Sequence, residues 1–178
     1  YSLSTHMPGA YNFVNMLAAI AAGVHFEIEP EKMVGVLSDY RPDNNRSQIA
    51  EGISNTLLLD AYNANPSSMK ISLEDFVSGD GHKKMVILGE MLELGEESEA
   101  EHRLILDWLI KSKIDKAMLI GEHFVELSES GNYPFLFFSD IQGCMDYLSD
   151  NKPSGYQILL KGSRKNALEQ ATNLLLGC

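Results

Sequence analysis

The chain has 178 residues, of which 44% are hydrophobic, and this length suits one ordinary domain or a domain with part of a neighbour. Lys and Arg number 14 against 25 Asp and Glu, which gives a formal net charge of -11 with no local basic patch. Such an acidic surface repels nucleic acid and anionic lipid, so the composition argues against both as main partners, while the apolar content argues against wholesale disorder.

The sequence lacks the usual marks of export or membrane insertion. Its most apolar stretch, residues 13–24, is interrupted by Asn15 and falls short of the roughly 18 to 20 residues that a membrane span needs. Residues 1–6 have neither the basic start nor the apolar middle of a secretory signal. Only Cys144 and Cys178 could pair, which is too few cysteines for a disulfide framework. We therefore expect a soluble protein of the reducing cytoplasm.

Two helices are expected near the start of the chain. In residues 10–24 apolar side chains recur at the three-and-four spacing of an amphipathic helix, and Gly23 suits its end. A second helix is predicted over residues 30–37, since Pro30 has the backbone angle of a first helical turn. Residues 40–46 lack periodicity and are rich in turn formers, so we interpret them as a connector between two domains.

After the connector, short apolar runs alternate with helical segments. Strands are predicted at residues 47–52, 56–61, 84–88, 116–120, 134–138 and 156–160. Several of these runs are apolar on both faces, which is typical of parallel strands covered by helices on both sides. The pattern predicts right-handed βαβ units and hence an α/β fold with a doubly wound, mostly parallel sheet.

Helix starts and the last helix are predicted from local patterns. Capping boxes are expected at Ser98 with Glu101 and at Ser139 with Gln142. The apolar stripe of a last helix is formed by Leu168, Ala171, Leu174 and Leu175.

Ligands of such a sheet bind beyond the carboxyl ends of the strands, so the loops there are the candidate site. The loop at 60–69 offers Asp60 as an acceptor for ribose hydroxyls and a helix N-terminus that favours an anion. Alternatively, its residues only shape a turn and Ser67 caps a helix. The loop at 161–164 places Lys161 and Arg164 where they suit a carboxylate or phosphate, unless Arg164 only pairs with a surface acid.

The loop that follows residue 88 is acidic. It contains Glu90, Glu93, Glu96 and Glu97. These side chains either bind a metal or an ammonium group, or form a solvated loop beside a helix N-terminus. Other candidates are weaker, because His82, His102 and His123 lack ligand spacing. Cys144 lies on an apolar helix face and is predicted to be core. No GxxxxGK[ST] phosphate loop, GxSxG, HExxH or CxxC motif occurs.

Several strings occur in one characteristic order. They are GAYNFVNMLAA at 9–19, RSQ at 46–48, DAYNANPSSM at 60–69, LGEMLELGE at 88–96, His102, and KGSR at 161–164 followed by Leu168-Glu169. Across nearly the whole chain the sequence resembles the Mur ligases of peptidoglycan synthesis, and DAYNANPSSM is typical of the members that add D-alanyl-D-alanine. The resemblance implies a Rossmann-like C-terminal domain at 39–178, preceded by residues 1–38 as the tail of the central ATP-binding domain. We therefore expect a C-terminal fragment of a monomeric bacterial ligase.

The resemblance also implies roles for individual residues. The nucleotide-binding residues are expected to be Asn12 and Asn15 at the adenine, Asp60 at the ribose, Tyr62 against the nucleotide and Arg46 at the phosphates, with Arg46 also catalytic. The dipeptide pocket is expected to include the loop at 89–95 with Asn63, Asn65, Lys161 and Ser163. The sequence departs from the family pattern at Tyr11, at Glu90 and at Lys165-Asn166-Ala167.

The activity implied is ATP-dependent formation of an acyl-phosphate on UDP-N-acetylmuramoyl-tripeptide, followed by attack of the D-alanyl-D-alanine amine. The phosphate loop and the Mg²⁺ ligands are expected in the absent central domain, so residues 1–178 alone are expected to be inactive. Two alternatives stay open. One is a sibling ligase, such as a folylpolyglutamate synthase, and the other is a non-catalytic module that binds adenine nucleotides.

Overall fold

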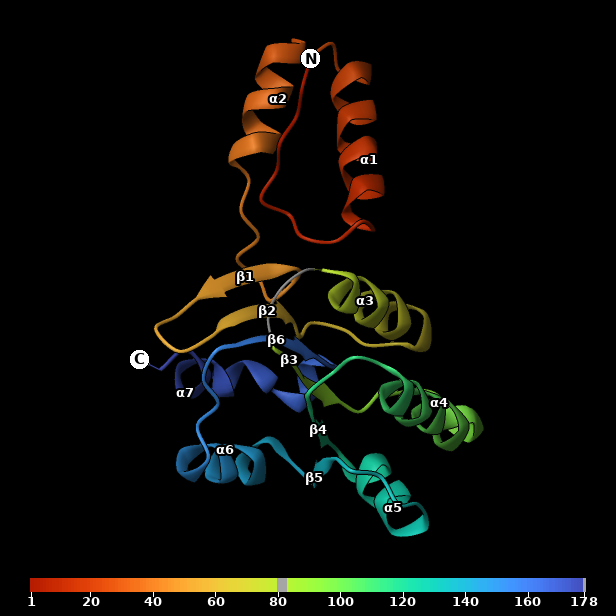
Figure 1. The fold of residues 1–178 in the computed structure, drawn as a ribbon. Helices are drawn as coiled ribbons and strands as arrows, with labels where there is room; N and C mark the ends of the chain where they lie inside the picture. The colour runs from red at the N-terminus through yellow and green to blue at the C-terminus, as the bar shows by residue number, and fades with distance from the viewer. Residues whose placement is uncertain (80–82, 178) are drawn as a thin grey trace.

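The computed structural model defines residues 1–79 and 83–177 of the chain (Figure 1). Two helices, α1 (Asn12–His25) and α2 (Pro30–Asp39), form an antiparallel pair that stands apart from an α/β domain. They pack so closely that a Cβ added at Gly23 would overlap the sulfur of Met33. The two helices predicted at 10–24 and 30–37 are confirmed to within two residues.

Within the described residues, the α/β domain is built on a six-stranded sheet. Its strands are β1 (Gln48–Glu51), β2 (Thr56–Asp60), β3 (Lys83–Gly89), β4 (Lys116–Ile120), β5 (Leu136–Phe138) and β6 (Tyr156–Lys161). Their order in space is β1-β2-β6-β3-β4-β5. The β1–β2 hairpin is antiparallel, whereas β2–β6, β6–β3, β3–β4 and β4–β5 are parallel pairs. Each predicted strand is present, and the predicted fold class is confirmed.

Helices cover both faces of this sheet (Figure 1). One face carries α3 (Pro66–Ser78), α4 (Ser98–Lys111) and α5 (Glu122–Ser130), and the other carries α6 (Ile141–Asp150) and α7 (Thr172–Leu176). Successive side chains of β3 enter opposite cores: Val86 and Leu88 pack under α3, α4 and α5, whereas Met85 and Ile87 pack under α6 and α7. This burial on both faces explains why the strands are continuous apolar runs.

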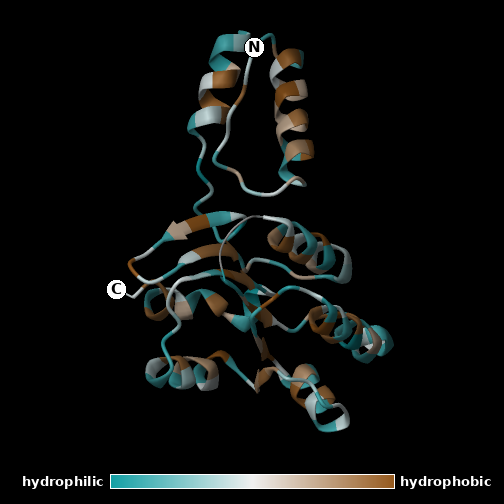
Figure 2. Ribbon diagram, in the orientation of Figure 1, coloured by the Kyte–Doolittle hydropathy of each residue, from teal (hydrophilic) through white to brown (hydrophobic). Residues whose placement is uncertain are grey.

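The helical pair, by contrast, leaves much of its apolar surface uncovered. Figure 2 shows hydrophobic residues along both helices. Phe13, Val14 and Val36 are each more than half exposed, and the buried residues of α1 are Asn12 and Gly23. None of the described helices has the length and apolar character needed to cross a bilayer.

The capping box predicted for Ser98 with Glu101 is wrong. Ser98 is the first residue of α4, Glu97 occupies the cap position, and no side chain caps the helix there. A short 3₁₀ helix, η1 (Gly95–Glu97), leads directly into α4, so the chain already has helical angles one residue before Ser98. The hydroxyl of Ser98 instead lies 3.4 Å from Nδ1 of His102.

The second box, predicted for Ser139 with Gln142, is also wrong, because the helix is capped one residue later and without a reciprocal bond. The carboxylate of Asp140 accepts a hydrogen bond from the Gly143 backbone N–H at 2.9 Å and caps α6. Asp and Ser are similarly good caps, and here the aspartate has the extended backbone that a cap requires.

The predicted last helix is interrupted. It is divided into a 3₁₀ turn, η3 (Leu168–Ala171), and the short helix α7. Leu168, Ala171 and Leu175 are nevertheless fully buried, so the predicted stripe faces the core. Cys144 is also core as predicted, and burial raises the pKa of its thiol to about 12. His82 and Cys178 lie outside the described residues.

Candidate functional site

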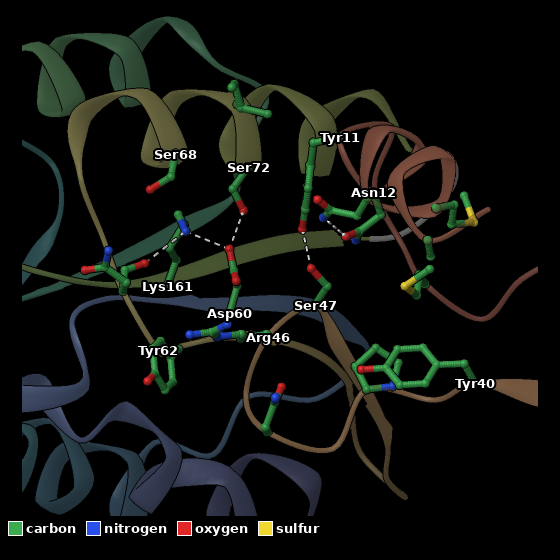
Figure 3. Close-up of a pocket in the computed structure, with 18 of the residues that line it drawn as sticks. Tyr11, Asn12, Tyr40, Arg46, Ser47, Asp60, Tyr62, Ser68, Ser72 and Lys161 are labelled. Carbon is green, nitrogen blue, oxygen red and sulfur yellow. Dashed lines mark hydrogen bonds and ion pairs between the residues drawn. The ribbon is translucent and has the colours of Figure 1, made fainter. Parts of the chain in front are cut away.

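A pocket of about 710 Å³ lies between the helical pair and the carboxyl end of the sheet (Figure 3). Strands β2 and β6 are parallel neighbours whose register pairs Asp60 with Lys161. The predicted site residues on its walls are Asn12, Asn15, Arg46, Asp60, Tyr62, Asn63, Asn65 and Lys161. Ser163 does not line this pocket. Its side chain accepts from the Lys165 backbone N–H at the start of η2 (Arg164–Asn166).

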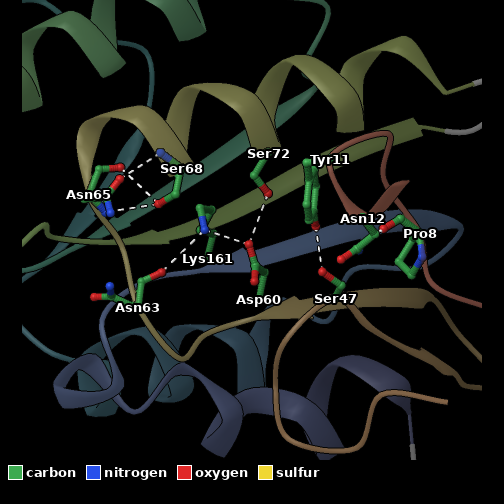
Figure 4. Close-up of polar contacts among 10 residues, drawn as sticks. All are labelled: Pro8, Tyr11, Asn12, Ser47, Asp60, Asn63, Asn65, Ser68, Ser72 and Lys161. Atoms are coloured by element: carbon green, nitrogen blue, oxygen red, sulfur yellow. Dashed lines mark hydrogen bonds and ion pairs between the residues drawn. The ribbon is translucent and has the colours of Figure 1, made fainter. Parts of the chain in front are cut away.

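Asp60 is held from behind by two side chains (Figure 4). Its Oδ2 accepts from the Lys161 ammonium at 2.6 Å and from the Ser72 hydroxyl at 3.4 Å. Lys161 is only 2% exposed, and its ammonium also lies 3.5 Å from the backbone oxygen of Asn63. The sequence indicated Asp60 and Lys161, but Ser72 was missed because nothing local marks one serine of α3 as the partner of a residue on β2.

The two asparagines of α1 form a small network of their own. Asn12 is buried, and its amide donates to the Pro8 backbone oxygen at 2.6 Å. The Asn15 amide donates to the Asn12 side-chain oxygen at 3.0 Å. Residues three apart in a helix lie on the same side, so the two side chains meet there. Their orientation is fixed by the chain itself, which suits recognition of a planar ring with its own donors and acceptors.

Arg46 stacks on Tyr62, with its guanidinium carbon 3.7 Å from the ring centroid. Arg164 approaches the same ring at 5.7 Å, and its backbone N–H donates to the Tyr62 backbone oxygen at 3.1 Å. Stacking fixes the plane of a guanidinium and leaves its N–H edge available for an anion. Two cations therefore gather around one tyrosine at the rim of the pocket.

Asn65 is committed to a helix end. Its side-chain oxygen accepts from the Ser68 backbone N–H at 2.8 Å, and the Ser68 hydroxyl accepts from the Asn65 backbone N–H at 3.1 Å. This reciprocal pair is a capping box for α3. The cap is thus Asn65, and the alternative that Ser67 caps the helix is wrong.

The acidic loop after β3 is fixed by His102, which is fully buried. Its Nε2 accepts from the Met91 backbone N–H at 2.8 Å, and its Nδ1 lies 2.7 Å from the Ser98 backbone oxygen. Glu90 turns toward α5, where its carboxylate accepts from the His123 backbone N–H at 3.3 Å. No group of three or more His, Cys, Asp or Glu side chains able to hold a metal ion occurs among the described residues.

Tyr11 and Ser47 join the two parts of the molecule beside the pocket, and sequence reasoning missed this contact. Their hydroxyl oxygens lie 2.7 Å apart, and the Ala10 backbone N–H donates to Asp75 at 3.1 Å. Burial, chiefly, raises the pKa of the Tyr11 phenol, so it stays protonated and can hydrogen-bond. Tyr11 was noted only as a departure from the family pattern, which gave no sign of its partner.

A family model described as "Mur ligase, glutamate ligase domain" matches residues 45–164. The chain belongs to the Mur ligase family. UDP-N-acetylmuramoyl-tripeptide--D-alanyl-D-alanine ligase of Bacillus subtilis (strain 168) is 32% identical to it over 175 residues, covering 94% of this chain and 38% of that protein. This Mur ligase chain therefore spans about 38% of the length of that relative.

Solved structures named MurF have the same fold as this Mur ligase chain. Crystal structure II of MurF from Acinetobacter baumannii gives a TM-score of 0.83 at 21% identity, covering 99% of this chain and 40% of that one. MurF ligase from Thermotoga maritima, in complex with ADP, gives 0.75 at 21% identity, covering 94% and 38%. At these identities the likeness establishes the fold alone.

Proposed function

We propose that this chain is the C-terminal part of an ATP-dependent ligase that joins D-alanyl-D-alanine to UDP-N-acetylmuramoyl-tripeptide in the cytoplasm. The observation that carries the proposal is the pocket at the carboxyl end of the sheet, where Asp60, Arg46 and Asn12 come together from three separate segments. The Bacillus subtilis relative bears the name of this activity, and it is similar over 94% of the chain.

The proposed domain division is residues 1–38 as the tail of a central domain and residues 39–178 as the C-terminal domain. It is supported by the uncovered apolar face of α1 and α2, where Phe13, Val14 and Val36 are more than half exposed. A surface of this kind is typical of an interface. In the longer ligase, the rest of the central domain would cover it.

ATP is the proposed nucleotide, and a relative in this fold was solved with ADP. Asn12 and Asn15 would hold the adenine, Asp60 would accept from the ribose hydroxyls, and Tyr62 would lie against the nucleotide. Asn63, the loop after β3 and the neighbouring residues 162–164 would hold the dipeptide. Asn65 could contact a ligand only through its side-chain amide nitrogen, since its side-chain oxygen caps α3.

The described residues do not fit a Mg²⁺ site of their own. Asp60 is the carboxylate on the pocket wall, and it is already paired with an ammonium group. Mg²⁺ prefers several oxygen ligands in a near-octahedral arrangement, and the described residues do not gather such a set. We therefore assign the metal ligands to the remainder of the ligase.

In the proposed reaction, the chain contributes charge and position. The guanidinium of Arg46, held flat on Tyr62, would stabilise negative charge on the phosphates as the tripeptide carboxylate is phosphorylated. The dipeptide held in the adjoining loops would then present its amine to the acyl-phosphate, and phosphate would leave. The C-terminal domain would act as a lid, which closes over the central domain and brings these groups to the reaction site there.

The test is phosphate release from ATP by the full-length ligase, given UDP-N-acetylmuramoyl-tripeptide with and without D-alanyl-D-alanine. We expect release that requires the dipeptide and that collapses in an Asp60→Ala variant. Release driven by a different amine would instead indicate a sibling ligase. Nucleotide binding without release for any pairing of substrates would indicate a non-catalytic binding module.

A further inference from the structure

Lys161 borders the pocket but is enclosed by the protein. It ends β6, which lies in the sheet between β2 and β3, and its side chain is 2% exposed. Its ammonium donates to Asp60 Oδ2 at 2.6 Å and lies 3.5 Å from the backbone oxygen of Asn63 (Figure 4). A ligand in the pocket would find little of this ammonium group to contact.

Asp60 has the opposite character, since part of its carboxylate faces the pocket. Its side chain is 17% exposed, and Oδ2 is engaged by Lys161 and Ser72. No protein donor to Oδ1 is found among the described residues. One oxygen is therefore anchored from behind, and the other is the atom available to a ligand.

We propose that Lys161 is a positioning residue: it orients and neutralises Asp60 for a ribose hydroxyl and does not bind the dipeptide itself. This assignment rests on the proposed function and replaces the expectation that Lys161 lines the dipeptide pocket. A carboxylate whose charge is balanced by a buried ammonium still accepts hydrogen bonds but attracts a cation less strongly. The Asp60–Lys161 pair thus favours a neutral hydroxyl donor over a metal ion.

The ammonium also contacts the middle of the loop that joins β2 to α3. Asp60 ends β2, and Asn63, which is proposed to contact the dipeptide, lies three residues further on. Removing the ammonium would free the Asp60 carboxylate to rotate. Its hydrogen bond to the ribose hydroxyl would then be poorly oriented, which we expect to weaken nucleotide binding about tenfold. The affinity for the nucleotide should fall, because the nucleotide is the ligand proposed to contact Asp60.

The experiment compares four variants of the full-length ligase: Lys161→Met, Asp60→Asn, the double variant, and Lys165→Met. Lys165 is a matched control, because it is an exposed lysine of the adjoining loop. The KM values for ATP and for D-alanyl-D-alanine are measured by phosphate release, and the Kd for ATP by calorimetry. Thermal unfolding reports whether each variant is folded.

In Lys161→Met we expect the KM and Kd for ATP to rise about tenfold, while the KM for the dipeptide stays within about twofold. The double variant should be no worse than Asp60→Asn, because both changes break the same contact. Lys165→Met should match the parent. A rise in the dipeptide KM that adds to the Asp60→Asn effect, or no change in either constant, overturns the proposal.

Lys161→Met leaves a partly buried carboxylate without its partner and can fail to fold. The double variant removes both charges, so its comparison with Asp60→Asn then decides: equal constants support the proposal, and a higher dipeptide KM overturns it. If the parent ligase shows no dipeptide-dependent release, the proposed function fails. The Kd for ATP still tests Lys161, since an ATP affinity in Lys161→Met equal to that of the parent contradicts its positioning role.

Discussion

A single imidazole sets the conformation of the loop that follows β3. The Met91 backbone N–H donates to Nε2 of His102, so this nitrogen must carry a lone pair, and Nδ1 must carry the proton that faces the Ser98 backbone oxygen. The neutral form is thus the one that the fold selects. Burial, chiefly, lowers the pKa of His102, and nearby His123 lowers it further, whereas the Ser98 backbone oxygen and Glu90 raise it.

Because the folded protein requires neutral His102, its free energy of unfolding should fall in mild acid. The ordinary histidine pKa is 6.5, so below that pH the unfolded chain binds a proton that the folded protein excludes. The stabilisation is complete above pH 6.5 and is lost as the pH falls toward the lower folded pKa, with a slope of up to about 1.4 kcal/mol per pH unit. Urea unfolding between pH 5 and 8, roughly the range in which histidines titrate, measures it. His102→Gln should flatten the slope and exposed His25→Gln should not, so equal slopes in parent and His102→Gln would contradict this account.

Asn55 connects three parts of the backbone at the far edge of the domain. Its amide donates to the backbone oxygens of Pro153 at 2.9 Å and Leu175 at 2.6 Å, and its oxygen accepts from the Tyr156 N–H at 2.9 Å. The residue is 4% exposed, so water cannot replace these bonds without rearrangement.

Asn55→Ala is therefore expected to lower the free energy of unfolding by about 2 to 4 kcal/mol, because it strands buried backbone groups. Urea denaturation measures the change. Asn173→Ala, an exposed asparagine on α7, provides the matched control and should fall within about 0.5 kcal/mol of the parent. A loss in Asn55→Ala no larger than in this control would show that the three bonds contribute little.

At the scale of the element, α3 begins beside the pocket with its own cap. Asn65→Ala removes the side-chain half of the capping box and should cost about 1 kcal/mol, whereas Asn65→Asp keeps an acceptor and should cost little. Ser67→Ala is the control, since Ser67 is exposed and does not cap the helix. Urea unfolding of the three variants distinguishes the two residues. If Ser67→Ala proves the costly change, the cap has been wrongly assigned.

Elements that rest on burial were predictable from the sequence, and those that rest on competing local bonds were not. The run from Lys84 to Leu88 could be predicted as a strand because both of its faces are covered. The choice between Ser139 and Asp140 as a cap depends on one backbone angle that the sequence does not determine. For the site, the sequence placed Asp60 and Lys161 at the carboxyl ends of two predicted strands, and the structure makes those strands neighbours. The contacts of Tyr11 with Ser47 and of Asp60 with Ser72 depend on tertiary packing, and no sequence pattern marked these two serines.

The whole molecule is two bodies joined by a bent connector, with the pocket between them. Asn45 and Ser47 have left-handed backbone angles, φ of 58° and 51°, which asparagine tolerates but which cost a serine about 1 to 2 kcal/mol. This strained bend leads directly into β1. Ser47 is also buried, and its hydroxyl meets the Tyr11 phenol at the start of α1. The contact therefore holds Asn12, the next residue of the chain, at the pocket wall.

Tyr11→Phe should weaken the contact between α1 and the α/β domain without unfolding the helical pair or that domain. Losing one hydrogen bond between partly buried hydroxyl groups weakens the docking of α1 by about 1 kcal/mol. Amide hydrogen exchange should then become faster in residues 11–15 and in the connector at 40–47, while β3 and β6 keep their protection. Tyr40→Phe is the control, because Tyr40 lines the same pocket with a 46% exposed side chain. Unchanged exchange in Tyr11→Phe would mean that the strained connector alone sets the position of the helices. Faster exchange confined to these two segments would identify the phenol as the contact that closes the pocket.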